Sequence, residues 1–132
     1  MVIPAEVRGA IARHAREEQP NESCGLLVLR DGVADRYEPG VNAAASPYRF
    51  DLCMDDPDVW FLEDEGLELA IVHSHLSSPP RPSRTDVEHI GLWRGKPYVI
   101  YTVRTDELAA WRIGDGGIEQ LPVRDHVTEE TG

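Results

Sequence analysis

This sequence of 132 residues contains few cysteines, few basic residues and no long hydrophobic run. Its two cysteines, Cys24 and Cys53, are too few for a disulfide framework and predict reduced thiols in a cytoplasmic protein. No apolar stretch approaches the ~20 residues that a transmembrane helix needs, and the N-terminus lacks a signal-peptide pattern, so no membrane association is expected. The 13 basic residues are outnumbered by 24 acidic ones, and the net charge of -11 disfavours a nucleic-acid partner.

Length and composition favour one folded domain. A chain of 132 residues can bury a single core without disulfides, and its hydrophobic fraction of 41% is ordinary for a globular protein. No internal repeat is visible. We therefore expect a single domain over residues 1–123, and a flexible tail over the polar residues 124–132.

The hydrophobic patterns predict helices packed on a mixed β-sheet, which is an α/β fold. The first helix is expected from Pro4 to Gln19, with His14 as a hydrogen-bonded histidine of the packed face. Further helices are expected over residues 57–66 and 86–93, the latter burying Asp86, His89, Ile90 and Trp93 on one face. Strands are expected at residues 24–29, 33–37, 48–51, 69–75, 98–103, 108–113 and 118–123.

Two histidines close to each other stand at the end of the apolar strand Leu69–His75. Because side chains alternate along a strand, His73 and His75 point to the same face, about 7 Å apart along the backbone. Asp86 lies on an inward-facing helical stripe, where a carboxylate needs a cation or several donors. Two histidines and one aspartate leave a fourth tetrahedral position open, which is typical of a catalytic zinc site.

Simpler interpretations of these residues remain open. A histidine pair can be only the polar end of a strand, and Ser83-x-x-Asp86 has the form of a helix capping box. Capping explains why a helix begins there, but not why Asp86 shares a face with apolar residues. A nucleophilic cysteine is disfavoured, because Cys24 lies in a packed strand with nothing nearby to lower its pKa.

The order His73-x-His75, seven residues, Ser83, two residues, Asp86 resembles the H-x-H-x7-S-x-x-D signature of the JAMM (MPN+) metalloprotease family. That family also has a glutamate upstream on its first core strand, and Glu22 stands in the matching position before C-G-L-L-V. The resemblance implies a three-layer α/β fold similar in outline to cytidine deaminases. Deamination itself is disfavoured, because the H-x-E and P-C-x-x-C motifs of zinc deaminases are missing.

The resemblance also implies a role for each residue. His73, His75 and Asp86 would hold one Zn²⁺ per chain, although the same ligands also suit iron or manganese. Glu22 would be the general base that takes a proton from the attacking water and passes it to the leaving group. Ser83 would donate a hydrogen bond to the oxyanion. From its own segment alone, Glu22 could equally be a solvated residue in a polar turn.

The substrate implied by the resemblance is an amide bond at the C-terminus of a small ubiquitin-like protein. The compact chain is similar to bacterial members that release cysteine from a sulfur-carrier protein ending in Gly-Gly, which predicts a part in cysteine biosynthesis. An isopeptidase that removes a ubiquitin-like modifier is an alternative. Two others are a non-catalytic binding module and a structural metal site closed by Cys24. The oligomeric state is not predicted.

Overall fold

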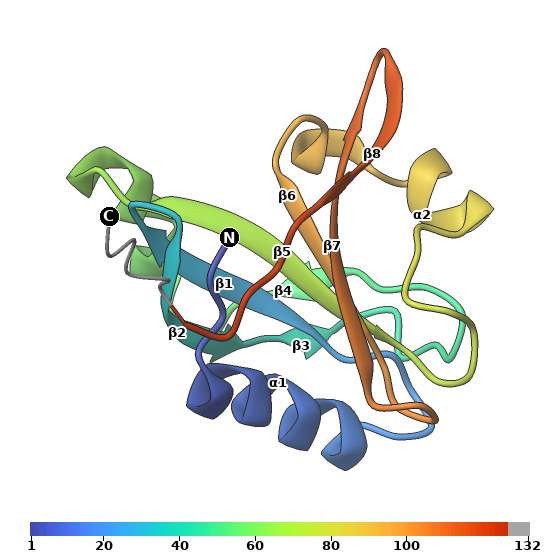
Figure 1. Ribbon diagram of the computed structural model, residues 1–132. Helices are drawn as coiled ribbons and strands as arrows, with labels where there is room; N and C mark the ends of the chain where they lie inside the picture. The colour runs from blue at the N-terminus through green and yellow to red at the C-terminus, as the bar shows by residue number, and fades with distance from the viewer. Residues whose placement is uncertain (127–132) are drawn as a thin grey trace.

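A computed structural model describes residues 1–126 and is built around a six-stranded sheet (Figure 1). The strand order is β2-β1-β5-β6-β7-β8. Strands β5 and β6 run parallel, whereas the other neighbouring pairs of this sheet are antiparallel, so the predicted mixed sheet is confirmed. The strands are β1 (Cys24–Arg30), β2 (Val33–Pro39), β5 (Glu68–His75), β6 (Pro97–Thr102), β7 (Glu107–Gly114) and β8 (Gly117–Leu121).

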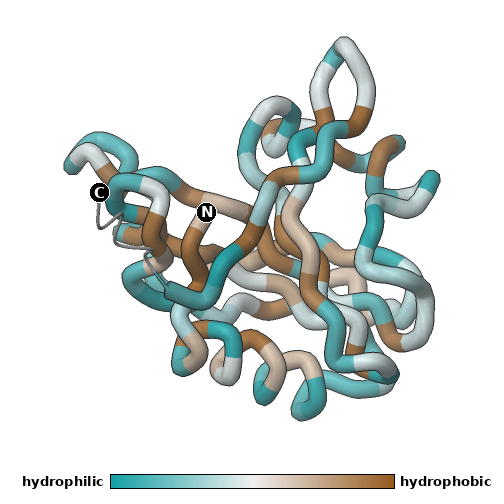
Figure 2. The backbone as a smooth tube through the Cα atoms, in the orientation of Figure 1, coloured by the Kyte–Doolittle hydropathy of each residue, from teal (hydrophilic) through white to brown (hydrophobic). Residues whose placement is uncertain are grey.

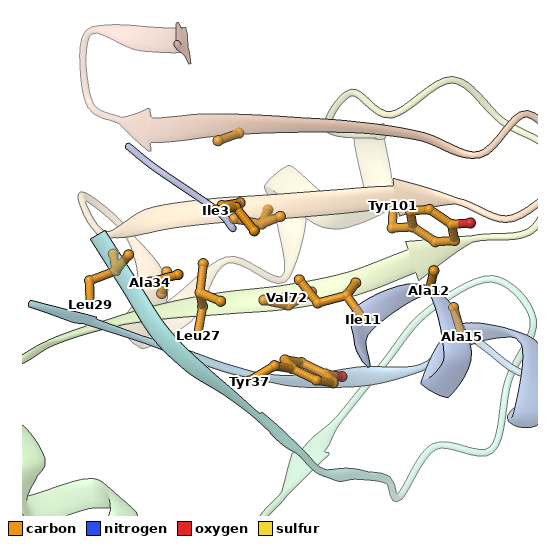
Figure 3. Packing of buried hydrophobic residues seen from close by; sticks show 13 residues of the cluster. Ile3, Ile11, Ala12, Ala15, Leu27, Leu29, Ala34, Tyr37, Val72 and Tyr101 are labelled. Atoms are coloured by element: carbon orange, nitrogen blue, oxygen red, sulfur yellow. The ribbon is translucent and has the colours of Figure 1, made fainter. Parts of the chain in front are cut away.

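Helix α1 (Ala5–Glu17) covers one face of this sheet. It buries Ile11 and Ala15 against a cluster that includes Leu27 of β1 and Val72 of β5, and Figure 3 shows these side chains between the helix and the sheet. The packed face also carries His14, whose Nδ1 lies 2.6 Å from the hydroxyl oxygen of Tyr37. The prediction of a hydrogen-bonded histidine on this helix is therefore confirmed.

Short helical segments and a small two-stranded sheet cover the opposite face. They pack Val59, Leu67 and Ile90 against a second cluster that includes Leu26 and Ile71 of the sheet. Figure 2 shows the corresponding pattern, with hydrophobic central strands and an α1 that alternates between hydrophobic and hydrophilic residues. The result is the predicted three-layer arrangement. The covering segments are η1 (Pro57–Glu65), α2 (Arg84–Glu88), η2 (Gly91–Trp93), β3 (Val41–Asn42) and β4 (Leu52–Cys53).

Two predicted elements differ from the structure. No strand covers residues 48–51; the short strands β3 and β4 flank this segment, which forms a loop between them. The helix predicted over residues 57–66 is present at Pro57–Glu65, where it is of the 3₁₀ type. The predicted helix 86–93 is divided: α2 ends at Glu88, where His89 leaves the helical region with a φ of -105° and a ψ of 18°, and the separate 3₁₀ segment η2 follows at Gly91–Trp93. His89 is consequently exposed, although Ile90 is buried as expected.

The end of the described chain pairs with its beginning. Arg124 forms a parallel bridge with Val2, and its carbonyl accepts a hydrogen bond of 2.7 Å from the backbone N–H of Ile3. Ordered pairing therefore extends to the first residue of the predicted tail, and residues 127–132 of that tail lie outside the described residues. Within residues 1–126, no helix is long and apolar enough to cross a membrane.

Candidate metal centre

The end of β5 places both histidines of the motif inside the molecule. His73 is fully buried and His75 is only 4% exposed. Both side chains leave the same face of the strand, as their spacing predicts, and their Nε2 atoms lie 3.2 Å apart. Two ring nitrogens from one strand therefore meet at one point.

Asp86, on the first turn of α2, completes this group. Its Oδ1 lies 3.2 Å from Nε2 of His73, and its Oδ2 lies 3.1 Å from Nε2 of His75. Zinc ligands at about 2.0–2.1 Å from the ion stand roughly 3.3 Å apart in a tetrahedron. The three side chains thus already have the separations that a tetrahedral ion requires, and they are the potential metal-binding group found among residues 1–126.

The charges in this group are strongly coupled. Burial alone would raise the pKa of Asp86, but hydrogen bonds to His73 and His75 hold that pKa far below its usual range. Burial lowers the pKa of His73, which favours the neutral imidazole that a metal ion needs. Burial also acts to lower the pKa of His75, yet its hydrogen bonds to Asp86 and to Pro79 raise it overall. An ionised carboxylate held this deep in the protein requires a cation beside it.

A backbone contact sets the orientation of the His75 ring. The Nδ1 atom of His75 lies 2.9 Å from the carbonyl oxygen of Pro79, which can only accept, so Nδ1 carries a hydrogen and Nε2 is the nitrogen that faces His73 and Asp86. The loop that supplies this carbonyl is itself tied to the sheet. Thr102 donates a hydrogen bond of 2.7 Å to the carbonyl of Ser78, and Trp111 donates one of 2.8 Å to the carbonyl of Pro80.

The ring of His73 is held by aromatic side chains. Phe50 stacks on it with ring centroids 4.6 Å apart and an angle of 22°, and Tyr98 meets it edge-on at 5.1 Å. Neither Phe50 nor Tyr98 was predicted from the sequence to be part of the site. Phe50 lies in a segment wrongly predicted as a strand, and no sequence signal indicates that it stacks on a histidine more than twenty residues away.

The register of β1 and β5 brings Glu22 to the histidines. Cys24 pairs with His73, and just beyond this pair the backbone N–H of Ser74 donates a hydrogen bond of 3.0 Å to the carbonyl of Ser23. Glu22 is only 4% exposed, and its Oε1 is buried without a hydrogen-bond partner in the described part of the chain. Burial raises the pKa of Glu22 to about 8, with Asp86 adding to this shift and His75 opposing it. A solvated turn residue, the simpler interpretation, is therefore excluded.

Ser83 lies beside the same cleft at the beginning of α2. The cleft has a volume of about 390 Å³ and is lined by Glu22, His75 and Ser83 together with loop residues that include Tyr48. The structure thus brings the predicted residues together. His73 and Asp86 contact His75 directly, and Glu22 and Ser83 line the same cleft as His75. Their catalytic and ligand roles remain predictions.

Cys24 does not belong to this group. It is buried in β1, and burial together with nearby acidic groups raises the pKa of its thiol to about 12. A thiol that stays protonated at neutral pH is a poor nucleophile, and the potential metal-binding group found among residues 1–126 does not include Cys24. The structure therefore disfavours both the cysteine nucleophile and a metal site closed by Cys24.

Comparisons with known proteins agree with this geometry. Residues 4–114 match the family model described as prokaryotic homologues of the JAB domain. The chain is 35% identical to the CysO-cysteine peptidase of Mycobacterium tuberculosis, over 93% of this chain and 89% of that protein. It is 34% identical to the desampylase of Haloferax volcanii, over 74% of this chain and 77% of that protein.

The fold is similar to that of a JAB1/MPN domain protein from Archaeoglobus fulgidus, with a TM-score of 0.61 and 21% identity over 94% of this chain and 97% of that one. The resemblance to JAMM/MPN proteins inferred from the motif is thereby confirmed, as is the fold class. The chain belongs to the family of prokaryotic JAB-domain proteins.

Proposed function

We propose that this protein is a zinc-dependent hydrolase that cleaves an amide bond after the Gly-Gly end of a small ubiquitin-like sulfur carrier and thereby releases cysteine. The proposal rests on one observation: Glu22, whose buried carboxyl oxygen Oε1 has no hydrogen-bond partner in the described part of the chain, lines the same cleft as His75 of the His73–His75–Asp86 group. A buried polar atom without a partner is costly unless a ligand or a reaction makes use of it.

His73, His75 and Asp86 would hold the ion, with a fourth position open toward the cleft. When bound, zinc supplies Lewis acidity, which makes water more acidic and polarises a carbonyl oxygen. The separations of 3.1–3.2 Å among the ligand atoms fit this ion. Two relatives are named a peptidase and a desampylase, and these names support the general assignment of a hydrolase.

Glu22 is suited to move the proton. Because its pKa of about 8 lies near neutrality, its carboxylate can accept a proton from water and return it to the leaving amine. This role predicts a rate contribution of about a hundredfold to ten-thousandfold.

Ser83 is suited to stabilise the oxyanion. Its Oγ already accepts a hydrogen bond of 3.1 Å from the backbone N–H of Asp86. A serine hydroxyl has one hydrogen to donate, and this bond leaves that hydrogen available to a substrate oxygen. Preorganised donors of this kind contribute strongly to acyl-transfer reactions.

The shape of the cleft and the relatives support the choice of substrate. Tyr48, Pro47 and Leu76 line a cleft of about 390 Å³, in which glycine residues fit most easily because they have no side chains. The relative that is 35% identical is named a CysO-cysteine peptidase, and the match covers most of both chains. A carrier protein with a neutral or basic face would complement the net charge of -11.

An isopeptidase that removes a ubiquitin-like modifier is the second candidate. The desampylase relative supports it, at 34% identity over 74% of this chain. Both reactions use the same residues, because each cleaves an amide bond after a C-terminal glycine. They differ in the leaving group, which is free cysteine in one case and a lysine side chain in the other.

Mass spectrometry of a purified carrier bearing a C-terminal Gly-Gly-Cys tests the proposal. The zinc-loaded protein should remove one cysteine, and a chelator should abolish this activity. The variant Glu22→Gln should retain zinc and lose most of the turnover. A carrier joined through its terminal glycine to a lysine side chain tests the second candidate in parallel.

The outcomes separate the candidates. Cleavage of the lysine conjugate alone would favour the isopeptidase. Binding of the carrier without cleavage of either substrate would favour a non-catalytic binding module. A Glu22→Gln variant with wild-type turnover would remove Glu22 from the mechanism, and a purified protein that does not bind zinc would overturn the proposal.

A further inference from the structure

The two histidines of the metal centre are supported in different ways. The remote nitrogen of His75, Nδ1, is held by the carbonyl of Pro79 at 2.9 Å. The corresponding Nδ1 of His73 is buried and has no hydrogen-bond partner among the described residues. Histidines that bind metals usually donate this second N–H to an oxygen, which fixes the orientation of the ring. His73 must therefore be oriented by another contact.

The geometry points to Phe50 as the positioning residue that holds His73 in its ligand orientation. Its ring centroid lies 4.6 Å from that of the imidazole at an angle of 22°, and Tyr98 also contacts the imidazole, edge-on at 5.1 Å. Aromatic pairs at such distances are attractive and restrict rotation of the ring. The stack thus fixes the orientation of the His73 ring, as the hydrogen bond to the Pro79 carbonyl fixes that of the His75 ring. This inference rests on the proposed metal site.

Asn42 holds the backbone on both sides of Phe50. Its Oδ1 accepts a hydrogen bond of 2.9 Å from the N–H of Asp51, and its Nδ2 donates one of 3.0 Å to the carbonyl of Arg49. The other Nδ2 hydrogen goes to the carbonyl of Glu22 at 3.0 Å. A further bond of 3.1 Å from the N–H of Ala44 to Oδ1 uses the remaining acceptor position.

The side-chain amide of Asn42 is therefore fully engaged, and it joins the Phe50 segment to the backbone of Glu22. A loop without regular structure, residues 43–51, is held in this way against the segment just before β1, which carries the proposed general base Glu22. The Phe50 stack is consequently part of a rigid unit rather than a chance contact of a free loop.

Zinc affinity, measured by competition with a chromophoric chelator in the absence of substrate, tests this inference. Phe50→Leu should weaken zinc binding by about tenfold to a hundredfold, the usual cost of losing support for a metal ligand. Phe50→Tyr, which keeps the ring, should restore the affinity. The matched control is Phe61→Leu, because Phe61 is 62% exposed and belongs to η1; its zinc affinity should equal that of the wild type.

Unfolding of the metal-free variants by urea separates positioning from general destabilisation. Phe50 is half-buried at the margin of its cluster, so Phe50→Leu should still fold. A folded Phe50→Leu with wild-type zinc affinity would overturn the inference, and so would an equal loss in Phe50→Leu and Phe50→Tyr. Failure of the wild type to bind zinc would instead overturn the proposed function.

The contribution of Asn42 is tested with Asn42→Asp, which places an oxygen opposite the carbonyls of Glu22 and Arg49. This variant should also weaken zinc binding. Combining it with Phe50→Leu should add little further loss, because both changes release the same ring. Fully additive losses would contradict the part of the inference that concerns Asn42.

Discussion

Ser83 and Asp86 hold each other through two reciprocal hydrogen bonds. The N–H of Asp86 donates to Oγ of Ser83 at 3.1 Å, and the N–H of Ser83 donates to Oδ2 of Asp86 at 2.8 Å. This is a capping box at the beginning of α2. The same carboxylate also contacts both histidines, so the helix cap fixes the position of the proposed third metal ligand. Capping and metal binding are thus compatible functions of one residue.

Replacing Ser83 should affect stability and turnover separately. Ser83→Ala removes the side-chain acceptor of the cap and should lower the free energy of unfolding by about 1 kcal/mol. Ser83→Gly should lower it by only a few tenths of a kcal/mol, because glycine is tolerated as an N-cap residue. Both variants lack the hydroxyl, and both should lose about a hundredfold in kcat. Urea unfolding and steady-state kinetics measure the two effects.

A Ser83→Gly variant with wild-type kcat would show that Ser83 acts only as a helix cap. The variant Ser83→Thr supplies the control, because it retains both the cap acceptor and the hydroxyl donor.

Asp86→Asn should nearly abolish metal binding while the protein remains folded. The amide can still accept the hydrogen bond from Ser83, but one of the two oxygens that face the histidines becomes an NH₂ group. Zinc affinity should fall by roughly a hundredfold or more, as measured by chelator competition. Glu88→Gln, which changes an exposed carboxylate of the same helix, should retain wild-type affinity. Comparable zinc affinity in Asp86→Asn would exclude Asp86 as a ligand.

Zinc should stabilise the folded protein. At a free zinc concentration of a hundred times the Kd, binding to the folded state alone raises the free energy of unfolding by about 2.7 kcal/mol. Thermal unfolding with and without a chelator measures this effect. His75→Gln should lose the stabilisation, whereas His89→Gln should keep it, because His89 is exposed and outside the proposed ligand set. Equal stabilisation of both variants would place the ion elsewhere.

Acidic pH should destabilise the fold through His14. Burial lowers the pKa of His14 below its ordinary value of 6.5, although Glu18 and Glu17 act in the opposite direction. The unfolded chain then binds a proton more readily than the folded one, so the contribution of His14 to stability is present above pH 6.5 and is lost as the pH falls through its lower folded pKa. Protonation would place a hydrogen on both ring nitrogens, so that Nδ1 could only donate to the hydroxyl oxygen of Tyr37, which lies 2.6 Å away.

The pH effect is measured by urea unfolding between about pH 7.5 and 5.5 with a chelator present. His14→Gln should lose less stability than the wild type over this range, while His89→Gln, a change of an exposed histidine, should follow the wild type. If the stability of His14→Gln and that of the wild type depended equally on pH, His14 would not be the cause of the destabilisation at acidic pH.

The central motif was predictable because its geometry is local. His73 and His75 share a face of any strand that contains them, and a capping box specifies where Asp86 stands on its helix. Local patterns predict the wrong structure where tertiary contacts override propensity. The segment 48–51 has the composition of a strand, but Asn42 holds its backbone in a loop instead.

The sequence by itself determined the mixed α/β architecture, the family resemblance and the candidate ligand set, because these follow from hydrophobic periodicity and from residue spacing within single elements. Only the tertiary structure decided that Glu22 is buried beside His75, since this depends on the register of β1 against β5. It also decided that Phe50 supports His73, a contact between a loop and a strand. Such contacts join segments distant in the chain, and no local pattern specifies which side chains will meet.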